Sequence, residues 1–168
     1  LWRDLYKPGK WEDLWFRWDG KPLLLADKNF IKDEALLDFF TFRRPMPDYW
    51  EGPSGPDQWS WLEVHPQHVF KNSLDEAEQM SVGVAQNALP DTPGPAPFSH
   101  KAGAMGRSWH DGARDTRANA TSLGLNFQEQ WDRALEVAPK FIFVTGWNEW
   151  IAGRYQECLD WLDARADT

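Results

Sequence analysis

Short apolar runs, each bounded by glycine, proline or polar turn residues, recur along this chain and predict buried strands. Two of them, residues 21–27 and 141–147, are almost continuously apolar, which is typical of parallel strands covered on both faces. Five strands are predicted in all: Pro22 to Ala26, Phe39 to Arg43, Trp59 to Val64, Met80 to Gln86 and Phe141 to Trp147.

Helical spacing is clearest from Leu125 to Val137, where Pro139 ends the helix just before the last predicted strand. Two more helices are predicted, at Trp11 to Trp18 and at Ile151 to Arg165. Helices alternating with strands indicate βα units and an α/β fold. We therefore predict a partial TIM-type (β/α) barrel that contributes the C-terminal strands only.

The length supports a fragment of a barrel. The chain has 168 residues, whereas eight βα units usually need about 200 to 250. Residues 1–168 are thus expected to form a single barrel domain that lacks its N-terminal strands. The missing part of the same barrel is the expected partner, because five units leave an open sheet edge and an isolated fragment should be poorly stable.

Composition excludes several classes of function. A net charge of -8 and a pI near 4.9 disfavour binding to nucleic acid or to anionic lipid. No apolar run approaches the roughly 18 residues of a membrane span. The single cysteine, Cys158, excludes an internal disulfide. Twelve tryptophans suggest core filling, a cleft in which indole rings stack on sugars, or both.

Two long segments rich in proline and glycine, residues 44–58 and 89–106, separate the middle strands. Both contain aromatic and charged residues, which favours ordered loops that border a site. In a parallel βα fold the carboxyl ends of the strands form the active face. Carboxylates, amides and arginines gather at these predicted ends, and they suit glycoside chemistry: Asp27, Arg43, Arg44, Glu63, His65, Gln86, Asn87, Asn148 and Glu149.

Glu149 is the strongest catalytic candidate. It directly follows an apolar strand and lies between Trp147 and Trp150 in the sequence. Partial desolvation by the indoles would raise its pKa, as a proton donor near neutral pH requires. Asn148 would hold a sugar hydroxyl or the carboxylate. The alternative is that Glu149 only caps the helix that follows.

The segment 143–150, Phe-Val-Thr-Gly-Trp-Asn-Glu-Trp, resembles the Asn-Glu-Trp segment of the endo-α-mannosidase-like glycoside hydrolases and related bacterial polysaccharide-locus proteins. Segments 56–64, 80–87 and 106–110 resemble uncharacterised bacterial members of that group. The resemblance implies a (β/α)8 barrel with two catalytic glutamates three residues apart, and a secreted or periplasmic location. Glu149 matches the first glutamate, but Ala152 occupies the second position.

A second carboxylate must therefore come from elsewhere, and Glu63 is preferred over Asp27 and Asp111. The alternative for Glu63 is a buried ion pair with Arg43 or Arg44. Substrate contacts are predicted from residues at the strand ends and in the long loops: Asp27, Arg43, Arg44, Trp59, Trp61, His65, Gln86, Asn87, Arg107, Trp109, His110, Trp147, Asn148 and Trp150.

The leading hypothesis is a glycoside hydrolase acting on a polysaccharide or glycan, with no cofactor. A non-catalytic carbohydrate-binding barrel remnant is the second hypothesis, because of Ala152. A metal-dependent hydrolase is the third, in which His65, His68 and His110 would gather with a carboxylate around a divalent ion.

Overall fold

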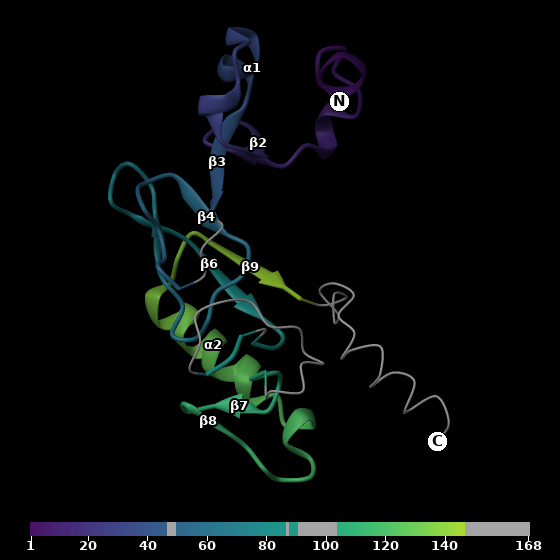
Figure 1. The fold of residues 1–168 in the computed structure, drawn as a ribbon. Helices are drawn as coiled ribbons and strands as arrows, with labels where there is room; N and C mark the ends of the chain where they lie inside the picture. The colour runs from purple at the N-terminus through teal and green to yellow at the C-terminus, as the bar shows by residue number, and fades with distance from the viewer. Residues whose placement is uncertain (47–49, 87, 91–103, 147–168) are drawn as a thin grey trace.

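The fold is described from a computed structural model, for residues 1–46, 50–86, 88–90 and 104–146. Helices and short strands are mixed along the chain (Figure 1). The helices are η1 (Trp2–Tyr6), η2 (Glu12–Leu14), η3 (Lys28–Phe30), α1 (Glu34–Phe39), η4 (Ala120–Ser122) and α2 (Leu125–Val137). The strands are β1 (Arg17–Trp18), β2 (Lys21–Leu25), β3 (Thr41–Met46), β4 (Gln58–Ser60), β5 (Phe70–Lys71), β6 (Ala77–Gly83), β7 (Trp109–His110), β8 (Ala113–Arg114) and β9 (Phe141–Thr145).

Parallel pairing joins the longer strands of the sheets. Strands β2, β3 and β4 pair in parallel in sequence order, and β1 adds to β2 in the antiparallel direction. Strands β6 and β9 also pair in parallel, with Gln79 opposite Phe141 and Gly83 opposite Thr145. The short strand β5 runs antiparallel along β6. The apolar runs predicted from sequence are thus the parallel strands β2, β3, β4, β6 and β9.

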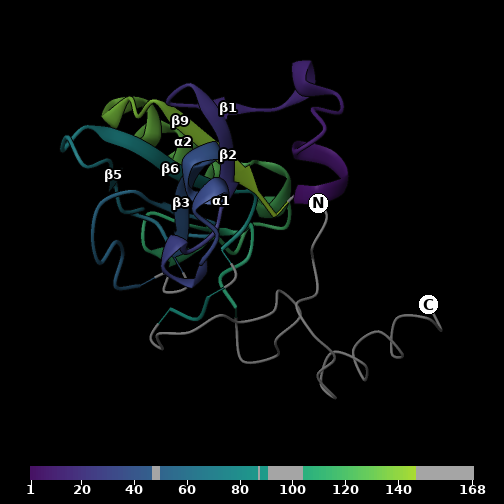
Figure 2. The same cartoon turned by 90° about the horizontal axis from the view of Figure 1, so that it is seen from above.

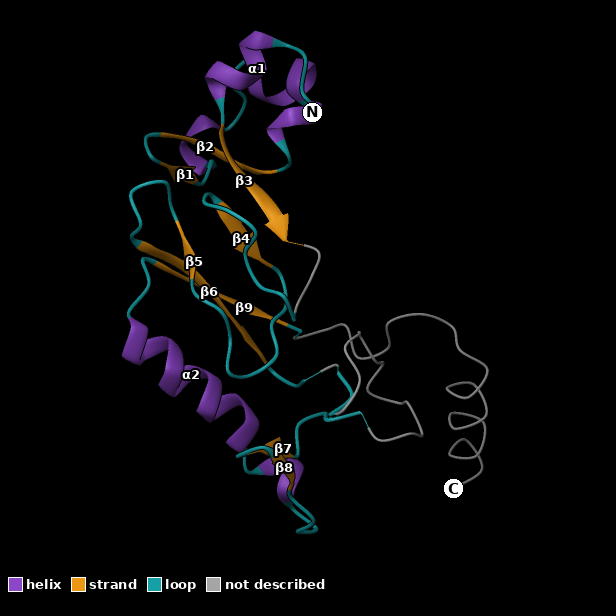
Figure 3. Ribbon diagram, turned by 60° about the vertical axis from the view of Figure 1, so that its left-hand side comes forward, coloured by secondary structure: helices purple, strands orange, loops and turns teal. Residues whose placement is uncertain are grey.

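Side chains connect the two parallel groups where β4 approaches β6. The hydroxyls of Ser60 and Ser81 lie 2.6 Å apart, and the Gln79 amide accepts from the Ser60 N–H at 2.9 Å and donates to the Ser60 carbonyl at 3.1 Å. The strands together form a curled sheet that makes part of a barrel (Figure 3). The prediction of an α/β fold with a partial, curved sheet is confirmed at this level.

One face of this sheet is covered by α2, which lies alongside β6 and β9 (Figure 1 and Figure 2). Met80 and Val82 of β6 pack with Ala134 of α2, and Ile142 of β9 joins them. The Gln130 side chain also accepts from the Gly83 N–H and donates to the Gly83 carbonyl, each at 2.8 Å. The predicted bounds of this helix, Leu125 to Val137, are confirmed.

The opposite face of the sheet is aromatic. It carries a hollow of about 140 Å³ lined by Phe16, Leu23, Leu25, Trp59, Phe141 and Phe143. Trp59 stacks on Phe141 with ring centroids 4.8 Å apart. Phe16 is 53% exposed and Leu25 is 37% exposed, although both line this hollow. This apolar face is therefore incompletely covered within the described part of the chain.

The predicted helix from Trp11 to Trp18 is wrong. Trp11 has a left-handed φ of 57°, only a single 3-10 turn follows, and the segment ends in strand β1. Asp19 and Gly20 then form a two-residue connection to β2, with φ of 50° and 79°. Positive φ at both positions is the conformation that Asp-Gly favours in hairpin turns, and this local signal outweighs the helical spacing of the apolar residues.

Two strands begin earlier and end sooner than the apolar pattern predicted. Strand β4 stops at Ser60, and β6 covers Ala77–Gly83 instead of Met80 to Gln86. The pairs Phe70↔Gln79 and Lys71↔Ala77 leave Glu78 as an extra residue in a β-bulge. Buried Glu78, Gln79 and Ser81 belong to β6, so a hydrophobicity pattern places the start of this strand too late.

Two tryptophans of the N-terminal region pack in an aromatic cluster. Trp2 and Trp15, both partly buried, pack with Tyr6, Phe39 and Phe40 in a cluster of mostly edge-on rings. Among the described residues, Trp59 is the tryptophan that is buried in the core, at 3% exposed. Among the described helices, none combines the length and the apolar character that crossing a membrane would require.

Candidate functional site

His65 and Gln86 connect the carboxyl ends of β4 and β6. The backbone N–H of His65 donates to Gln86 Oε1 at 2.8 Å. Gln86 itself is 2% exposed, and its backbone N–H and carbonyl pair with Gly106 in the returning loop. Two residues predicted to contact substrate are thus brought together at the end of the sheet that holds the active face in parallel βα folds.

The side chain of Gln67 contacts the ring of His65. Its Oε1 lies 3.1 Å from His65 Nδ1, while its Nε2 donates to the carbonyls of Ser81 and Gln130 at 3.0 and 3.2 Å. Gln67 is fully buried. A side chain with this many fixed partners orients its neighbour, and His65 is accordingly held by both its backbone and its ring.

Glu63 holds the second histidine of this segment. Its side chain is fully buried, and Oε2 accepts from the backbone N–H of His68 at 3.2 Å and lies 2.7 Å from its Nδ1. The ring of His68 packs on Gly52, where an added Cβ would lie 2.5 Å from the ring. Gly52 also has a φ of +73°, so only glycine fits here without strain.

The ion pair considered for Glu63 with Arg43 or Arg44 is wrong. Arg43 pairs with Glu78, and Arg44 lies 3.3 Å from Asp27. The physical reason is that Glu78, at the bulge in β6, binds the Arg43 guanidinium with both carboxylate oxygens, so this cation is already paired. The Glu63 carboxylate instead contacts the backbone N–H and the ring of His68.

Two buried polar atoms at the carboxyl ends of the strands make no hydrogen bond within the described residues. They are Nε2 of Gln86 and Oγ1 of Thr145, the last residue of β9. Thr145 is 5% exposed, and its backbone carbonyl accepts from the Val84 N–H just after β6. Leaving such a buried group unbonded costs about 1 to 3 kcal/mol each, and native proteins retain few of them.

An aromatic surface begins at the same end. Trp61 directly follows β4 and is 49% exposed, and its ring meets that of Phe143 edge-on at 5.4 Å. Trp59 is different, because it is 3% exposed and its indole N–H donates to Glu78. Of these two predicted substrate contacts, Trp61 presents a ring to solvent and Trp59 supports the core.

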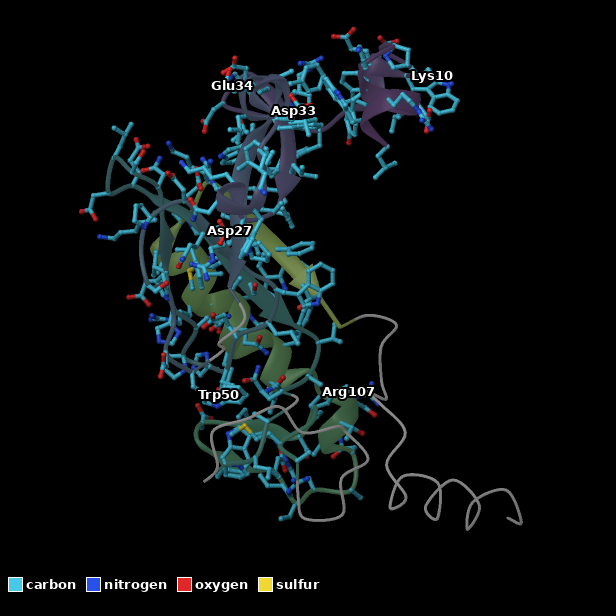
Figure 4. All side chains as sticks on the ribbon, turned by 45° about the horizontal axis from the view of Figure 1, so that its top comes forward. Lys10, Asp27, Asp33, Glu34, Trp50 and Arg107 are labelled. Atoms are coloured by element: carbon cyan, nitrogen blue, oxygen red, sulfur yellow. The ribbon has the colours of Figure 1, made fainter. Side chains whose placement is uncertain are left out.

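Asp27 and Arg44 border a separate polar hollow of about 350 Å³ between the end of β2 and the start of β4. Asp27 also caps η3 by accepting from the Asn29 N–H at 2.9 Å. Figure 4 shows Asp27 and Arg107 well apart, so these two predicted contacts do not share one site.

Arg43 belongs to a saturated network near the amino end of β6. Glu78 is 1% exposed and accepts from Arg43 Nε and from the Trp59 indole at Oε2, at 2.6 and 2.7 Å. Its Oε1 accepts from Arg43 at 2.6 Å and from the Trp18 indole at 2.8 Å. Burial raises the pKa of Glu78, but these hydrogen bonds outweigh it and leave the pKa below its ordinary value. Arg43, which was predicted to contact substrate, therefore stabilises the fold through its ion pair with Glu78.

Trp109 and His110 form one strand of the β7–β8 hairpin, which packs beside α2 through a 2.6 Å hydrogen bond from Asn126 to the Trp109 carbonyl. His110 lies 3.2 Å from Asp115 and 3.1 Å from Asp111, and hydrogen bonds to these carboxylates, Asp115 first, raise its pKa. Arg117 lowers the pKa of Asp115 in turn. Both ring nitrogens of His110 are therefore engaged within the hairpin.

Several predicted residues lie outside the described part of the chain: Glu149, Asn87, Trp147, Asn148 and Trp150, together with the helix predicted from Ile151 to Arg165. Within the described ranges, no three histidine, cysteine, aspartate or glutamate side chains come together in a way that would hold a metal ion. The three histidines of the metal hypothesis instead have different partners: Gln67, Glu63 and the two aspartates of the hairpin.

Sequence reasoning missed three residues near the carboxyl ends, Gln67, Glu129 and Thr145, and also Glu78 near the amino end of β6. Gln67 and Glu78 are buried polar residues, and a search for apolar runs does not select them. Glu129 lies on the polar face of α2, where its Oε2 is 3.9 Å from His65 Nε2 and accepts from the Asp111 N–H at 2.9 Å. Only for Thr145 did the sequence offer a signal, because this threonine ends an otherwise apolar strand.

Comparison of the chain with protein-family models, with curated proteins and with solved structures found no match in any of the three. The geometry of the residues themselves is therefore the basis for any assignment of function.

Proposed function

We propose that this chain carries part of a carbohydrate-active site, that the site lies at the carboxyl ends of β4, β6 and β9, and that it hydrolyses a glycosidic bond of a polysaccharide or glycan. The observation that carries the proposal is the pair of buried, unbonded polar atoms at these ends, Gln86 Nε2 and Thr145 Oγ1. A bound ligand with oxygen atoms would satisfy an amide donor and a hydroxyl, which the described residues do not.

The surroundings favour a sugar over other oxygen-rich ligands. Trp61 offers an exposed ring for the apolar face of a pyranose, and His65 and Gln86 offer hydrogen-bonding groups in the segments that follow β4 and β6. The carboxylate of Glu129 lies 3.9 Å from the His65 ring, and that of Glu63 contacts His68. A neutral saccharide therefore fits this region better than a phosphate or a nucleotide.

The finer fold proposal is a TIM-type (β/α) barrel, of which residues 1–168 form the C-terminal strands. Two parallel groups, β2-β3-β4 and β6-β9, which follow one another in sequence and curl into part of a barrel, support it. The half-exposed lining of the apolar hollow, Phe16 and Leu25, supports it as well, because barrel strands would cover these side chains. The N-terminal part of the barrel is the partner this proposal requires.

Glu149 is the acid/base residue of the proposal. It follows Thr145 by four positions in the sequence, and its chemistry there would be the protonation of the leaving oxygen. We expect Glu149→Gln to lower hydrolysis of a susceptible glycan by about 10²- to 10⁴-fold while sugar binding persists. Reducing-end release from a panel of neutral polysaccharides measures the first quantity, and calorimetric titration measures the second.

Glu136→Gln is the matched control, because Glu136 lies exposed on α2 and should leave both quantities unchanged. Ala152 supports a second candidate, a carbohydrate-binding protein without catalysis. In that case the wild-type chain binds sugar but releases no reducing ends at any pH. Failure of the whole panel to bind the wild-type chain would refute both candidates.

A further inference from the structure

His65 is fixed in the structure at two points. Its backbone N–H donates to Gln86 Oε1 at 2.8 Å, and its Nδ1 lies 3.1 Å from Gln67 Oε1. The side chain is nevertheless 27% exposed. A histidine that is held this firmly and still reaches the surface resembles the bases of enzymes, in which a neighbouring group orients the imidazole.

The partners of Gln67 determine which nitrogen of His65 carries the proton. Gln67 Nε2 donates to two backbone carbonyls, those of Ser81 and Gln130. Because a carbonyl accepts hydrogen bonds and never donates them, the amide nitrogen must face these two groups. Gln67 Oε1 therefore faces His65 as an acceptor, and the hydrogen-bond pattern assigns the proton of the neutral imidazole to Nδ1.

The lone pair of His65 is consequently left on Nε2. Among the described residues, Glu129 lies within ion-pair distance of this nitrogen, with Oε2 3.9 Å away and so beyond direct hydrogen-bonding distance. This carboxylate is 15% exposed and is anchored by the Asp111 N–H at 2.9 Å. A carboxylate in this position stabilises the imidazolium that forms when Nε2 takes a proton.

We propose that His65 is the proton-accepting residue of this site and that Gln67 is the residue that positions it. The inference rests on the proposed glycosidase function and supplies the second acid/base group that Ala152 leaves missing. It also changes the role of Glu63, which holds His68 and has no part in the proton transfer.

The proposed step is balanced as follows. His65 Nε2 takes a proton from a water molecule, the water oxygen bonds to the anomeric carbon, and the bond from that carbon to the leaving oxygen breaks. The leaving oxygen takes a proton from Glu149. The imidazolium then returns its proton to solvent and Glu149 regains one, so the reaction consumes one water molecule and yields an inverted hemiacetal.

His110 provides the internal comparison. Both of its ring nitrogens lie within 3.2 Å of an aspartate, and these contacts raise its pKa. Both ring nitrogens of His110 are thereby engaged by carboxylates, whereas His65 keeps one nitrogen unbonded within the described residues. The two histidines should respond differently to any probe of the free imidazole lone pair.

The first experiment is ¹⁵N NMR of the full chain at pH 8, with the His65 signals assigned by their loss in His65→Asn. We expect the proton on Nδ1 and an unprotonated Nε2. Gln67→Met should remove this preference, and the wild-type spectrum decides the matter if that variant does not fold. A wild-type His65 with its proton on Nε2 would overturn the proposal.

The second experiment uses diethyl pyrocarbonate, which reacts with unprotonated imidazole nitrogen, and maps the modified histidines by mass spectrometry at pH 7. His65 should react about tenfold faster than His110, because both ring nitrogens of His110 are hydrogen-bonded to aspartates and the raised pKa of His110 further disfavours its unprotonated form. Equal rates would contradict the assignment of a free lone pair to His65.

The third experiment separates this inference from the function on which it rests. On a glycan that the wild-type chain hydrolyses, His65→Gln should lower kcat by about 10²-fold or more with little change in binding. Full turnover by His65→Gln refutes the role of His65 and leaves the glycosidase proposal intact. Absence of any hydrolysed or bound glycan refutes the glycosidase proposal, while the tautomer and the reactivity of His65 remain as measured.

Discussion

The two ends of the parallel strands differ in whether their buried polar groups have hydrogen-bond partners. Near the amino end of β6, Glu78 accepts two hydrogen bonds at each oxygen. At the carboxyl ends, Gln86 and Thr145 are equally buried but keep one polar atom each without a partner in the described residues. A fully hydrogen-bonded network stabilises the fold, whereas a buried polar atom without a partner destabilises it unless a ligand forms the missing hydrogen bond.

Threonine shows the same contrast with a single residue type. Thr41, at the start of β3, is 9% exposed and its hydroxyl donates to the Trp18 carbonyl at 2.6 Å. Thr145, at the end of β9, is 5% exposed and its hydroxyl makes no hydrogen bond within the described residues. Under the proposed function, the amino ends serve stability and the carboxyl ends serve binding, which is the division known from barrel enzymes.

The largest effect should come from breaking the saturated end. We expect Glu78→Gln to lower the free energy of unfolding by about 3 to 5 kcal/mol, because it leaves the Arg43 guanidinium buried without its main counter-charge. Urea denaturation followed by tryptophan fluorescence measures this change. Glu76→Gln is the control, since Glu76 is half-exposed in its ion pair with Lys140 and should matter little. Similar losses in the two variants would show that burial at Glu78 carries no special weight.

Acid should act on the same network. The pKa of Glu78 is lower in the folded chain than its ordinary value of 4.5, so its contribution to stability is fully present above pH 4.5. That contribution declines as the pH falls below 4.5 toward the folded pKa, because the unfolded chain then binds a proton that the folded chain resists. Denaturation midpoints between pH 3 and 7 should fall less steeply for Glu78→Gln than for the wild type. Parallel curves would mean that Glu78 does not titrate as described.

Apolar patterns were enough to locate the parallel strands and α2. Parallel strands that are covered on both faces need apolar side chains at nearly every position, and the continuous apolar runs 21–27 and 141–147 show this in the sequence. The turn at Asp19-Gly20 was overlooked in favour of helical spacing, although the dipeptide itself signals a hairpin.

The candidate site was only partly predictable. His65 and Gln86 were found because they follow predicted strands, and the structure joins them by a hydrogen bond. Gln67 and Glu129 were missed because their roles depend on contacts across 14 and more positions in sequence. The bulge at Glu78 was also beyond reach, since a bulge reverses the alternation from which strand faces are read.

The smallest expected effect is also the most direct test. Valine matches threonine in shape and lacks only the hydroxyl, so Thr41→Val and Thr145→Val report on one hydrogen bond at each end of the sheet. We expect Thr41→Val to lower the free energy of unfolding by about 1 kcal/mol, and Thr145→Val to raise it by about the same amount. Urea denaturation of the two variants without ligand measures both. A loss of stability in Thr145→Val as large as that in Thr41→Val would contradict the central claim that the carboxyl ends hold groups reserved for a ligand.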